Sequence, residues 1–95
     1  MAQVIWSPSA LEDVDAIASF IARDSADTAA LFVHRMISAT DRLCDFPESG
    51  RVIPEIGNVS CREIIFGSYR IMYRIESGDV WIAGVVHGAR DWHKK

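Results

Sequence analysis

The stretch from Cys61 to Glu76, CREIIFGSYRIMYRIE, constrains the fold of this chain more than any other part of its sequence. It contains two runs of strand-forming residues joined by Gly67-Ser68, and a glycine in the first place of such a pair favours a two-residue hairpin turn. Side chains alternate between the faces of a strand, so the second run is expected to be two-sided. Its apolar face consists of Tyr69, Ile71, Tyr73 and Ile75, and its other face of Arg70, Met72 and Arg74. The sequence therefore predicts a β-hairpin that places one face in the core and arginines on the other.

An amphipathic helix is expected near the start of the chain, after a short first strand at Gln3–Trp6. Ser7 is a typical N-cap and Pro8 suits the first helical position, although a capping box beginning at Ser9 competes with this start. The helix is expected to end near Asp24. Its apolar stripe consists of Leu11, Val14, Ile17, Ala18 and Ile21, and its polar side of Glu12, Asp13, Asp15 and Ser19.

A second amphipathic helix follows, with Asp27 as its predicted cap and Pro47 as its stop. His34 and Arg35 are expected on its solvent side. Its apolar stripe consists of Ala29, Phe32, Val33, Met36, Thr40, Leu43 and Cys44. Two such helices joined by a few residues form a helical hairpin, and both stripes require a shared apolar partner.

The strands after the helices supply that partner. Gly50–Val52 is expected to start a short strand within the irregular, proline- and glycine-rich stretch Phe46–Asn58. After the central hairpin, Ser77-Gly78 turns the chain into a last strand, Val80–His87, which is apolar on both faces and is therefore expected inside the sheet, with Trp81 in the core. The tail Gly88–Lys95 is polar, with room for one helical turn. The order β-α-α-β-β-β predicts one α+β domain, residues 1–95, in which the helical hairpin packs on a mainly antiparallel sheet.

Charge is distributed unevenly along the 95 residues, whose formal net charge is −3. Residues 1–48 carry eight acidic residues and three arginines, a net −5, whereas residues 49–95 carry five acidic and seven basic residues, a net +2. The acidic total argues against non-specific nucleic-acid binding as the main activity. An anionic partner is expected to meet the second half of the chain.

Other classes of protein have little support. No apolar run is long enough to span a membrane, and the N-terminus lacks the features of a secretory signal, so a cytoplasmic location is expected. Cys44 and Cys61 show no CxxC spacing and are expected to be buried free thiols. The histidines have no metal-ligand spacing and no glycine loop suits a phosphate, so neither a metal nor a cofactor is expected.

Four segments of the chain, in order, are WSPSALEDVDAIASFI, FPESGR, CREIIFGSYRIMYRI and VVHGARD, and they cover nearly its whole length. Together they resemble the RelE/ParE superfamily of bacterial toxins from type II toxin–antitoxin pairs. The ParE branch is the more similar one. Its motifs correspond here to Trp6-Ser7-Pro8, Arg62-Glu63, Tyr69-Arg70 and the run from His87 to Asp91.

The resemblance implies a small toxin that is held inactive in a hetero-oligomer with a cognate antitoxin, whose C-terminal segment wraps the helical hairpin and the sheet. For ParE-like members the implied target is DNA gyrase, trapped on cleaved DNA. For RelE-like members it is messenger RNA in the ribosomal A site. A third reading is a non-toxic relic that only binds an antitoxin.

Candidate catalytic residues are few. Cleavage of RNA needs a base, an acid and cations around the phosphate. RelE-like enzymes use lysines, arginines and a tyrosine near the C-terminus, whereas this chain has only the terminal Lys94 and Lys95 and no tyrosine after Tyr73. Glu63 and His87 remain as acid or base candidates, although a histidine at a strand end is more often structural. The cations for the phosphate would be Arg62, Arg70 or Arg90.

Candidate binding residues for an antitoxin or a target are Arg51, Arg62, Arg70, Arg74, Arg90 and Trp92. Arginines recognise carboxylates well, and tryptophan contributes strongly to interfaces. Each arginine has the alternative of staying solvated or of pairing with Glu55, Glu63 or Asp91. The resemblance to the ParE branch implies a gyrase-binding toxin, and the missing lysines and C-terminal tyrosine favour one without an active site of its own.

Overall fold

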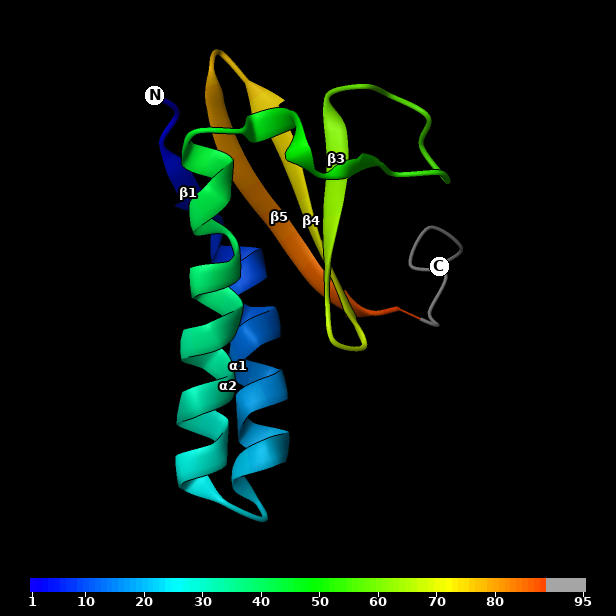
Figure 1. Cartoon of the computed structure of the whole chain (residues 1–95). Coiled ribbons are helices and arrows are strands. Elements are labelled where there is room, and N and C mark those ends of the chain that lie inside the picture. Colours follow the sequence, from blue (N-terminus) through cyan, green and yellow to red (C-terminus); the bar gives the residue numbers. More distant parts are fainter. Residues whose placement is uncertain (89–95) are drawn as a thin grey trace.

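The computed structural model describes residues 1–88 and shows two helices packed on one face of a five-stranded sheet (Figure 1). The strands have the order β1-β5-β4-β3-β2, and all neighbours are antiparallel except β1 and β5. The elements are β1 (Val4–Trp6), α1 (Pro8–Ala22), α2 (Ala26–Ala39), the 3₁₀ turns η1 (Asp41–Cys44) and η2 (Pro47–Ser49), β2 (Arg51–Val52), β3 (Cys61–Phe66), β4 (Tyr69–Glu76) and β5 (Asp79–His87). This confirms the predicted α+β architecture.

The two hairpin turns have the backbone conformations that their sequences predict. Gly67, between β3 and β4, has a φ of +58°. Ser77 and Gly78, between β4 and β5, have φ angles of 54° and 81°, and two positive φ angles in succession match the right-handed twist of the flanking strands. β5 lies between β1 and β4, which confirms that this doubly apolar strand is internal.

Local capping explains where the helices begin. The Ser7 hydroxyl accepts a hydrogen bond from the Ala10 N–H at 3.0 Å, so α1 begins as predicted. α2 differs from the prediction, because Ser25 is its N-cap and accepts from the Thr28 N–H at 3.2 Å. Asp27 lies in the first turn instead, where its carboxylate suits the positive end of the helix dipole.

The predicted end of the second helix at Pro47 was also wrong. α2 ends at Ala39, and the chain tightens into η1 and η2. The buried Thr40 side chain donates to the Ile37 carbonyl at 2.7 Å, and this local bond competes with the regular helical pattern. Leu43 still reaches the core, because the turn of η1 directs it inward.

The core lies between the helices and the face of the sheet that they cover. Its buried members include Val14, Met36, Leu43, Ile64, Ile71, Tyr73, Val80 and Ile82. Leu11, expected in the apolar stripe, is instead 48% exposed. Trp81 was expected in the core but lies on the opposite face of β5 from Val80 and Ile82, because side chains alternate along a strand. It is half-buried opposite Arg74.

Asp13 is a further departure from the predicted polar side of α1. β1 pairs only with residues 80–82 of β5, so the edge of β5 beyond them lacks a neighbouring strand. The half-buried Asp13 carboxylate accepts a hydrogen bond from the Val85 N–H at 2.9 Å on this open edge. A helical side chain therefore satisfies a backbone donor that a strand would otherwise satisfy.

The cysteines and the ends of the chain complete the comparison. Cys44 and Cys61 are free thiols, as predicted, but both are half-buried rather than fully buried. The helical turn expected within Gly88–Lys95 lies, apart from Gly88, outside the described residues. Among residues 1–88, no helix is long and apolar enough to cross a membrane.

Candidate functional site

The alternation of side chains along β3 and β4 divides the candidate arginines between two faces of the sheet. Arg62 lies opposite the core residue Tyr73, on the face that the helices cover. Arg70 and Arg74 lie on the other face, which we call the far face. Arg51 joins them there, because it lies opposite Glu63 in the pairing of β2 with β3. Arg62 is therefore separated from the arginines of the far face, and the prediction that the hairpin carries its arginines on one face was wrong for Arg62.

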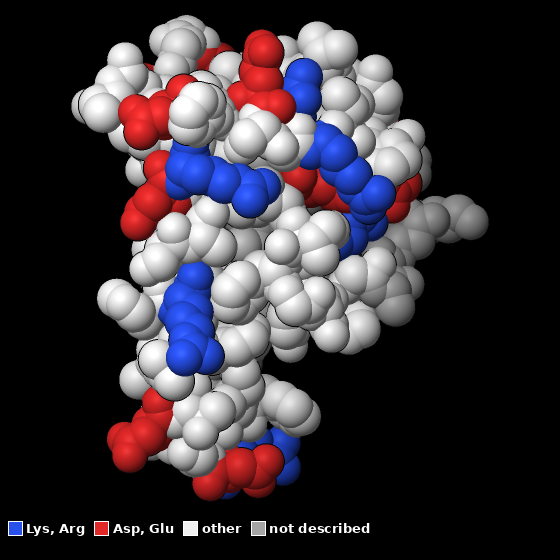
Figure 2. Space-filling view, viewed as in Figure 1, with Lys and Arg blue, Asp and Glu red and all other residues white. Residues whose placement is uncertain are grey.

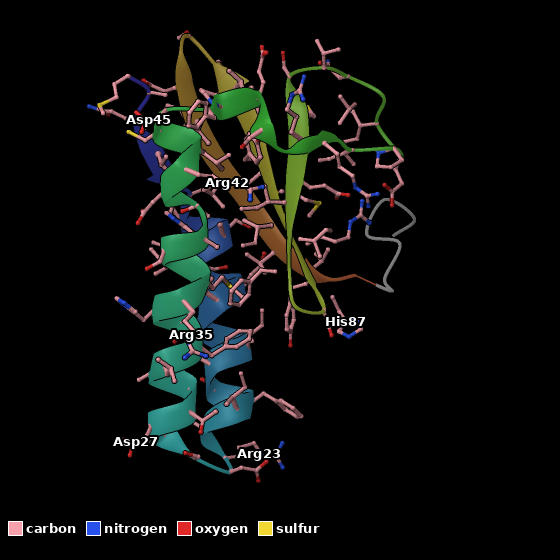
Figure 3. The ribbon with its side chains drawn as sticks, viewed as in Figure 1. Arg23, Asp27, Arg35, Arg42, Asp45 and His87 are labelled. Carbon is pink, nitrogen blue, oxygen red and sulfur yellow. The ribbon has the colours of Figure 1, made fainter. Side chains whose placement is uncertain are left out.

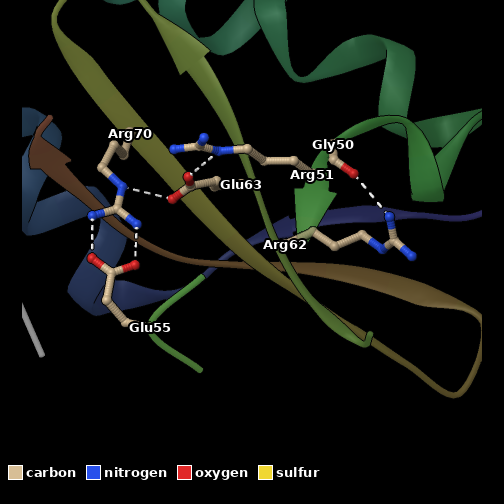
Figure 4. A network of polar contacts seen from close by, with 6 residues as sticks. All are labelled: Gly50, Arg51, Glu55, Arg62, Glu63 and Arg70. Carbon is tan, nitrogen blue, oxygen red and sulfur yellow. Dashed lines mark hydrogen bonds and ion pairs between the residues drawn. The ribbon is translucent and has the colours of Figure 1, made fainter. Parts of the chain in front are cut away.

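On the far face, Glu63 is the centre of an ion-pair network (Figure 4). Its side chain has no exposed surface, and both oxygens are occupied. Oε2 accepts from Nε of Arg51 at 2.6 Å, and Oε1 accepts from Nε of Arg70 at 2.6 Å. A buried carboxylate is tolerated only when its charge is paired and its lone pairs are satisfied. Two arginines meet that requirement here.

Arg70 has a second carboxylate partner. Its two terminal nitrogens donate to Glu55 at 2.8 and 2.7 Å, a bidentate pair that attaches the loop between β2 and β3 to the sheet. The hydrogen bonds to Glu55 are the main reason why the pKa of Arg70 lies above its usual value; burial opposes the rise, and Glu63 adds to it. Only 6% of the Arg70 side chain is exposed, which leaves little surface for a partner.

Arg51 and Arg74 are the accessible candidates of the far face. The Arg51 side chain is 60% exposed although its Nε contacts Glu63. Arg74 is 50% exposed and pairs with Glu76, itself 58% exposed, at 2.8 Å. An exposed ion pair of this kind is weak and exchanges readily for a partner's carboxylate. Arg90 and Trp92 lie outside the described residues.

Arg62 is bound differently, by backbone carbonyls alone. Its Nε donates to Val59 at 2.8 Å, and its Nη1 donates to Glu48 at 3.2 Å and to Gly50 at 2.9 Å. Within residues 1–88, no carboxylate forms an ion pair with Arg62. Its side chain is held in place, and its charge has no ion-pair partner among these residues.

The structure does not bring the candidate acid and base together. His87 is exposed at the end of β5, and its ring meets Tyr69 edge to face at 5.7 Å. Because Tyr69 and Glu63 point to opposite faces of the hairpin, His87 and Glu63 lie on opposite sides of the sheet. No scissile phosphate can contact both. Among the described residues, no group of three or more metal-ligating side chains forms either.

Sequence reasoning missed two features of the surface. One is Arg42, an exposed arginine on η1 (Figure 3). It was not predicted as a candidate because the second helix was expected to continue through this position. The other is a groove of about 650 Å³ along α1 and β5. Its lining includes Asp13, Ile17, Met72 and Val85. Figure 2 shows basic side chains on both the helical and the sheet part of one face, with acidic ones between them.

Comparison with known proteins identifies the family of this chain. Residues 4–92 match the model for the ParE toxin of the type II toxin–antitoxin system parDE. The chain belongs to the ParE toxin family. This confirms the resemblance found in the four sequence segments.

Relatives of this ParE-family chain match it along most of their length. It is 38% identical over 93 residues to toxin Y4kP of Sinorhizobium fredii, covering 95% of this chain and 92% of the relative. It is 35% identical over 91 residues to toxin RelE2 of Caulobacter vibrioides, covering 95% and 99%.

Two solved structures share the fold of the ParE-family chain. The chromosomal ParDE toxin–antitoxin system from P. aeruginosa matches with a TM-score of 0.77 at 17% identity, covering 92% of this chain and 96% of that one. The toxin–antitoxin complex RelBE2 from Mycobacterium tuberculosis matches with a TM-score of 0.58 at 21% identity, covering 90% and 96%. At these identities the likeness concerns the fold.

Proposed function

We propose that this ParE-family toxin inhibits DNA gyrase through protein contact, without an active site of its own. Membership of the ParE family supports the choice of gyrase, and the position of Glu63 supports a toxin without an active site. Both oxygens of Glu63 are bonded to arginines in the interior, and His87 lies on the other side of the sheet. A general base must lie within reach of the proton that it abstracts. Glu63 and His87 therefore do not form an acid–base pair around one substrate. Binding through exposed side chains is the function that this surface supports best.

We also propose that a cognate antitoxin neutralises the toxin in a hetero-oligomer. The two solved structures that share its fold come from toxin–antitoxin systems, which supports this assignment. The groove along α1 and β5 suits apolar side chains of the antitoxin, and Arg51 and Arg74 suit its carboxylates. Arg70 supports the same surface indirectly, because it holds the Glu55 loop in place. Arg90 and Trp92 remain candidate contacts. A toxin that meets gyrase and an antitoxin would act in the cytoplasm, and this location is part of the proposal.

A supercoiling assay with purified gyrase tests the gyrase proposal. We expect the isolated toxin to inhibit supercoiling and to accumulate gyrase on cleaved DNA. The control is the same toxin after incubation with its antitoxin, which is expected to leave gyrase active. Gyrase that stays fully active at saturating toxin would exclude it as the target.

Messenger-RNA cleavage on the ribosome is the second candidate, and the 35% identity to a relative named toxin RelE2 is the observation that favours it. Toeprinting on translating ribosomes distinguishes mRNA cleavage from gyrase inhibition, because only mRNA cleavage produces new codon-specific cuts.

Expression of the chain alone in a bacterium tests whether the chain is a non-toxic relic. Normal growth at full expression would indicate a chain that only binds its antitoxin.

A further inference from the structure

The groove along α1 and β5 includes part of the far face of the sheet, because Met72 and Arg74 of that face both line it. α1 contributes Asp13 and Ile17 to the lining, and the loop between β2 and β3 contributes Ile53. Its volume of about 650 Å³ is larger than that of any single side chain. The groove can therefore hold a short stretch of another chain.

Gly84 leaves part of the β5 backbone in this groove without a side chain. It lies opposite Met72 in the pairing of β4 with β5, and the register of the two strands shifts between Met72 and Tyr73. A Cβ atom at Gly84 would lie 3.2 Å from Oδ2 of Asp13 and 3.8 Å from Cε of Met72. A glycine inside a strand often marks a place where another backbone approaches closely, and such register shifts are common beside functional sites. A bound main chain can approach the sheet at this point.

Asp13 offers a hydrogen-bond acceptor beside Gly84. Its Oδ2 atom accepts from the Val85 N–H at 2.9 Å, and the residue is half-buried. Within residues 1–88, no hydrogen bond or ion pair occupies its Oδ1 atom. A carboxylate oxygen accepts from a peptide N–H, and the bond to Val85 already fixes the orientation of this carboxylate.

Arg74 offers donors in the same groove. Its Nε atom pairs with Glu76 at 2.8 Å, and within the described part of the chain no hydrogen bond occupies its two terminal nitrogens. A carboxylate can therefore bind these nitrogens in a bidentate way without displacing Glu76. Glu76 is 58% exposed and does not line the groove, so solvent weakens its repulsion of a second carboxylate.

We propose that this groove binds an extended segment of the cognate antitoxin, in which an apolar residue is followed by an acidic one. The N–H of the apolar residue donates to Oδ1 of Asp13 above Gly84, and its side chain packs against Met72. The acidic side chain reaches Arg74, which lies two residues beyond Met72 along β4. That separation is about 7 Å along a strand, a distance that the next side chain of the bound segment spans. The inference rests on the proposal above that an antitoxin neutralises the toxin.

The same groups disfavour a nucleic acid as the occupant. Among the described residues that line the groove, Arg74 is the only arginine and no lysine is present. Asp13 would repel the closely spaced phosphates of a nucleic-acid strand. A peptide segment satisfies both charged groups, because it carries an N–H donor for Asp13 and a single carboxylate for Arg74.

The test uses the full chain with ¹³C-labelled methionine methyl groups and two dipeptides, acetyl-Phe-Glu-amide and acetyl-Phe-Gln-amide. The three methionines report on different places: Met72 lines the groove, Met36 is buried in the core, and Met1 is 99% exposed. We expect the glutamate dipeptide to shift the Met72 signal in a saturable way and to leave the other two in place. We expect the glutamine dipeptide to bind about fivefold more weakly, the upper range for an exposed ion pair.

Arg74→Gln separates the contribution of the charge. We expect this variant to bind the two dipeptides equally, because the carboxylate has lost its partner. Arg35→Gln is the matched control, since it removes an exposed positive charge from α2 and is expected to keep the fivefold preference. Equal binding of both dipeptides by the unmodified chain, no shift of Met72, or equal shifts of all three methionines would each overturn the inference.

Gly84→Ala tests the approach of the bound main chain. The added methyl group would lie between Asp13 and Met72, so we expect both dipeptides to bind about tenfold more weakly. An unchanged Met36 signal in this variant shows that the core is still folded, which keeps the result independent of stability. Unchanged affinity in the folded variant would exclude a main chain above Gly84.

The antitoxin itself is the last arm of the test. We expect the purified toxin–antitoxin complex to show a shifted Met72 signal that the glutamate dipeptide no longer changes. A complex in which the dipeptide still shifts Met72 would overturn the groove as the antitoxin site while leaving neutralisation by an antitoxin intact. Failure of the antitoxin proposal would look different, because the toxin would then form no complex at all.

Discussion

Glu63 and Arg70 come from adjacent strands of one hairpin, and the Glu63 Oε1 atom lies 2.6 Å from the Arg70 Nε atom in the interior of the protein. Arg70 extends the pair to Glu55, and Arg51 extends it to the surface. A network of this kind joins the sheet to the loop between β2 and β3. Arg70 is therefore a structural residue, whereas Arg51 belongs to the network and also remains exposed for binding.

Replacement of Glu63 tests that structural role. Glu63→Gln removes the negative charge from between Arg51 and Arg70, so we expect the free energy of unfolding to fall by about 3 kcal/mol, as for other broken buried ion pairs. Urea denaturation measures the change. Glu76→Gln, in the exposed pair with Arg74, is the control and is expected to cost less than about 1 kcal/mol. Equal losses in the two variants would contradict a special role for the buried network.

Reversal of charge at two arginines of the same face separates stability from binding. Arg70→Glu places a third carboxylate beside Glu55 and Glu63, so we expect a strongly lowered melting temperature and weaker antitoxin binding as a consequence. Arg74→Glu changes an exposed side chain, so we expect normal melting and antitoxin affinity reduced by about tenfold. Circular dichroism and calorimetry measure the two effects. Normal melting of Arg70→Glu would show that its ion pairs are dispensable.

Gly50→Ala tests the close approach of the Gly50 backbone, between η2 and β2, to the Tyr73 side chain. The new methyl group would collide with the Tyr73 hydroxyl and with the β3 backbone. We expect a loss of about 1–3 kcal/mol in the free energy of unfolding, the usual range for overpacking. Ser49→Ala, at an exposed neighbouring position, is expected to change stability by less than about 0.5 kcal/mol. If both variants unfold at the same urea concentration as the unmodified chain, the backbone at Gly50 is less constrained than we infer.

The buried tyrosine predicts a dependence of stability on alkaline pH. Burial raises the pKa of Tyr73 in the folded state, so the unfolded chain loses this proton first as the pH rises. The contribution of Tyr73 is complete below a pH of about 10, the pKa of an unperturbed tyrosine, and is lost above it. Urea denaturation from neutral to alkaline pH should show a steeper loss for the unmodified chain than for Tyr73→Phe. Parallel curves would contradict the assignment to Tyr73.

Much of the fold follows from local patterns. Ser7 and Pro8 predicted the start of α1, and Gly67 and the Ser77-Gly78 pair predicted the two hairpin turns. The helix start at Ser25 was missed because several polar residues near it can act as caps and only the geometry of the loop selects one. Asp13 was assigned to solvent because helical periodicity does not reveal that a neighbouring strand has an open edge.

The candidate site was only partly predictable. The sequence identified Glu63, Arg62 and Arg70 as candidates, and alternation along the second strand placed Arg70 and Arg74 on the face opposite the core. It could not show that Arg70 pairs with Glu55, because the two residues are 15 positions apart and meet only when the loop folds over the sheet. It also did not show that the Tyr73 hydroxyl binds the Pro47 carbonyl, because these residues are 26 positions apart in the sequence.

The sequence by itself indicated the family, the order of helices and strands, and the separation of β4 into an apolar and an arginine-bearing face. These depend on spacing, caps and turns, which act between residues close together in the chain. Only the tertiary structure decided which arginines keep their charge available. Pairing depends on which distant carboxylates or carbonyls the fold brings within hydrogen-bonding distance. Arg70 is therefore neutralised in the interior, whereas backbone carbonyls hold Arg62, which forms no ion pair within residues 1–88.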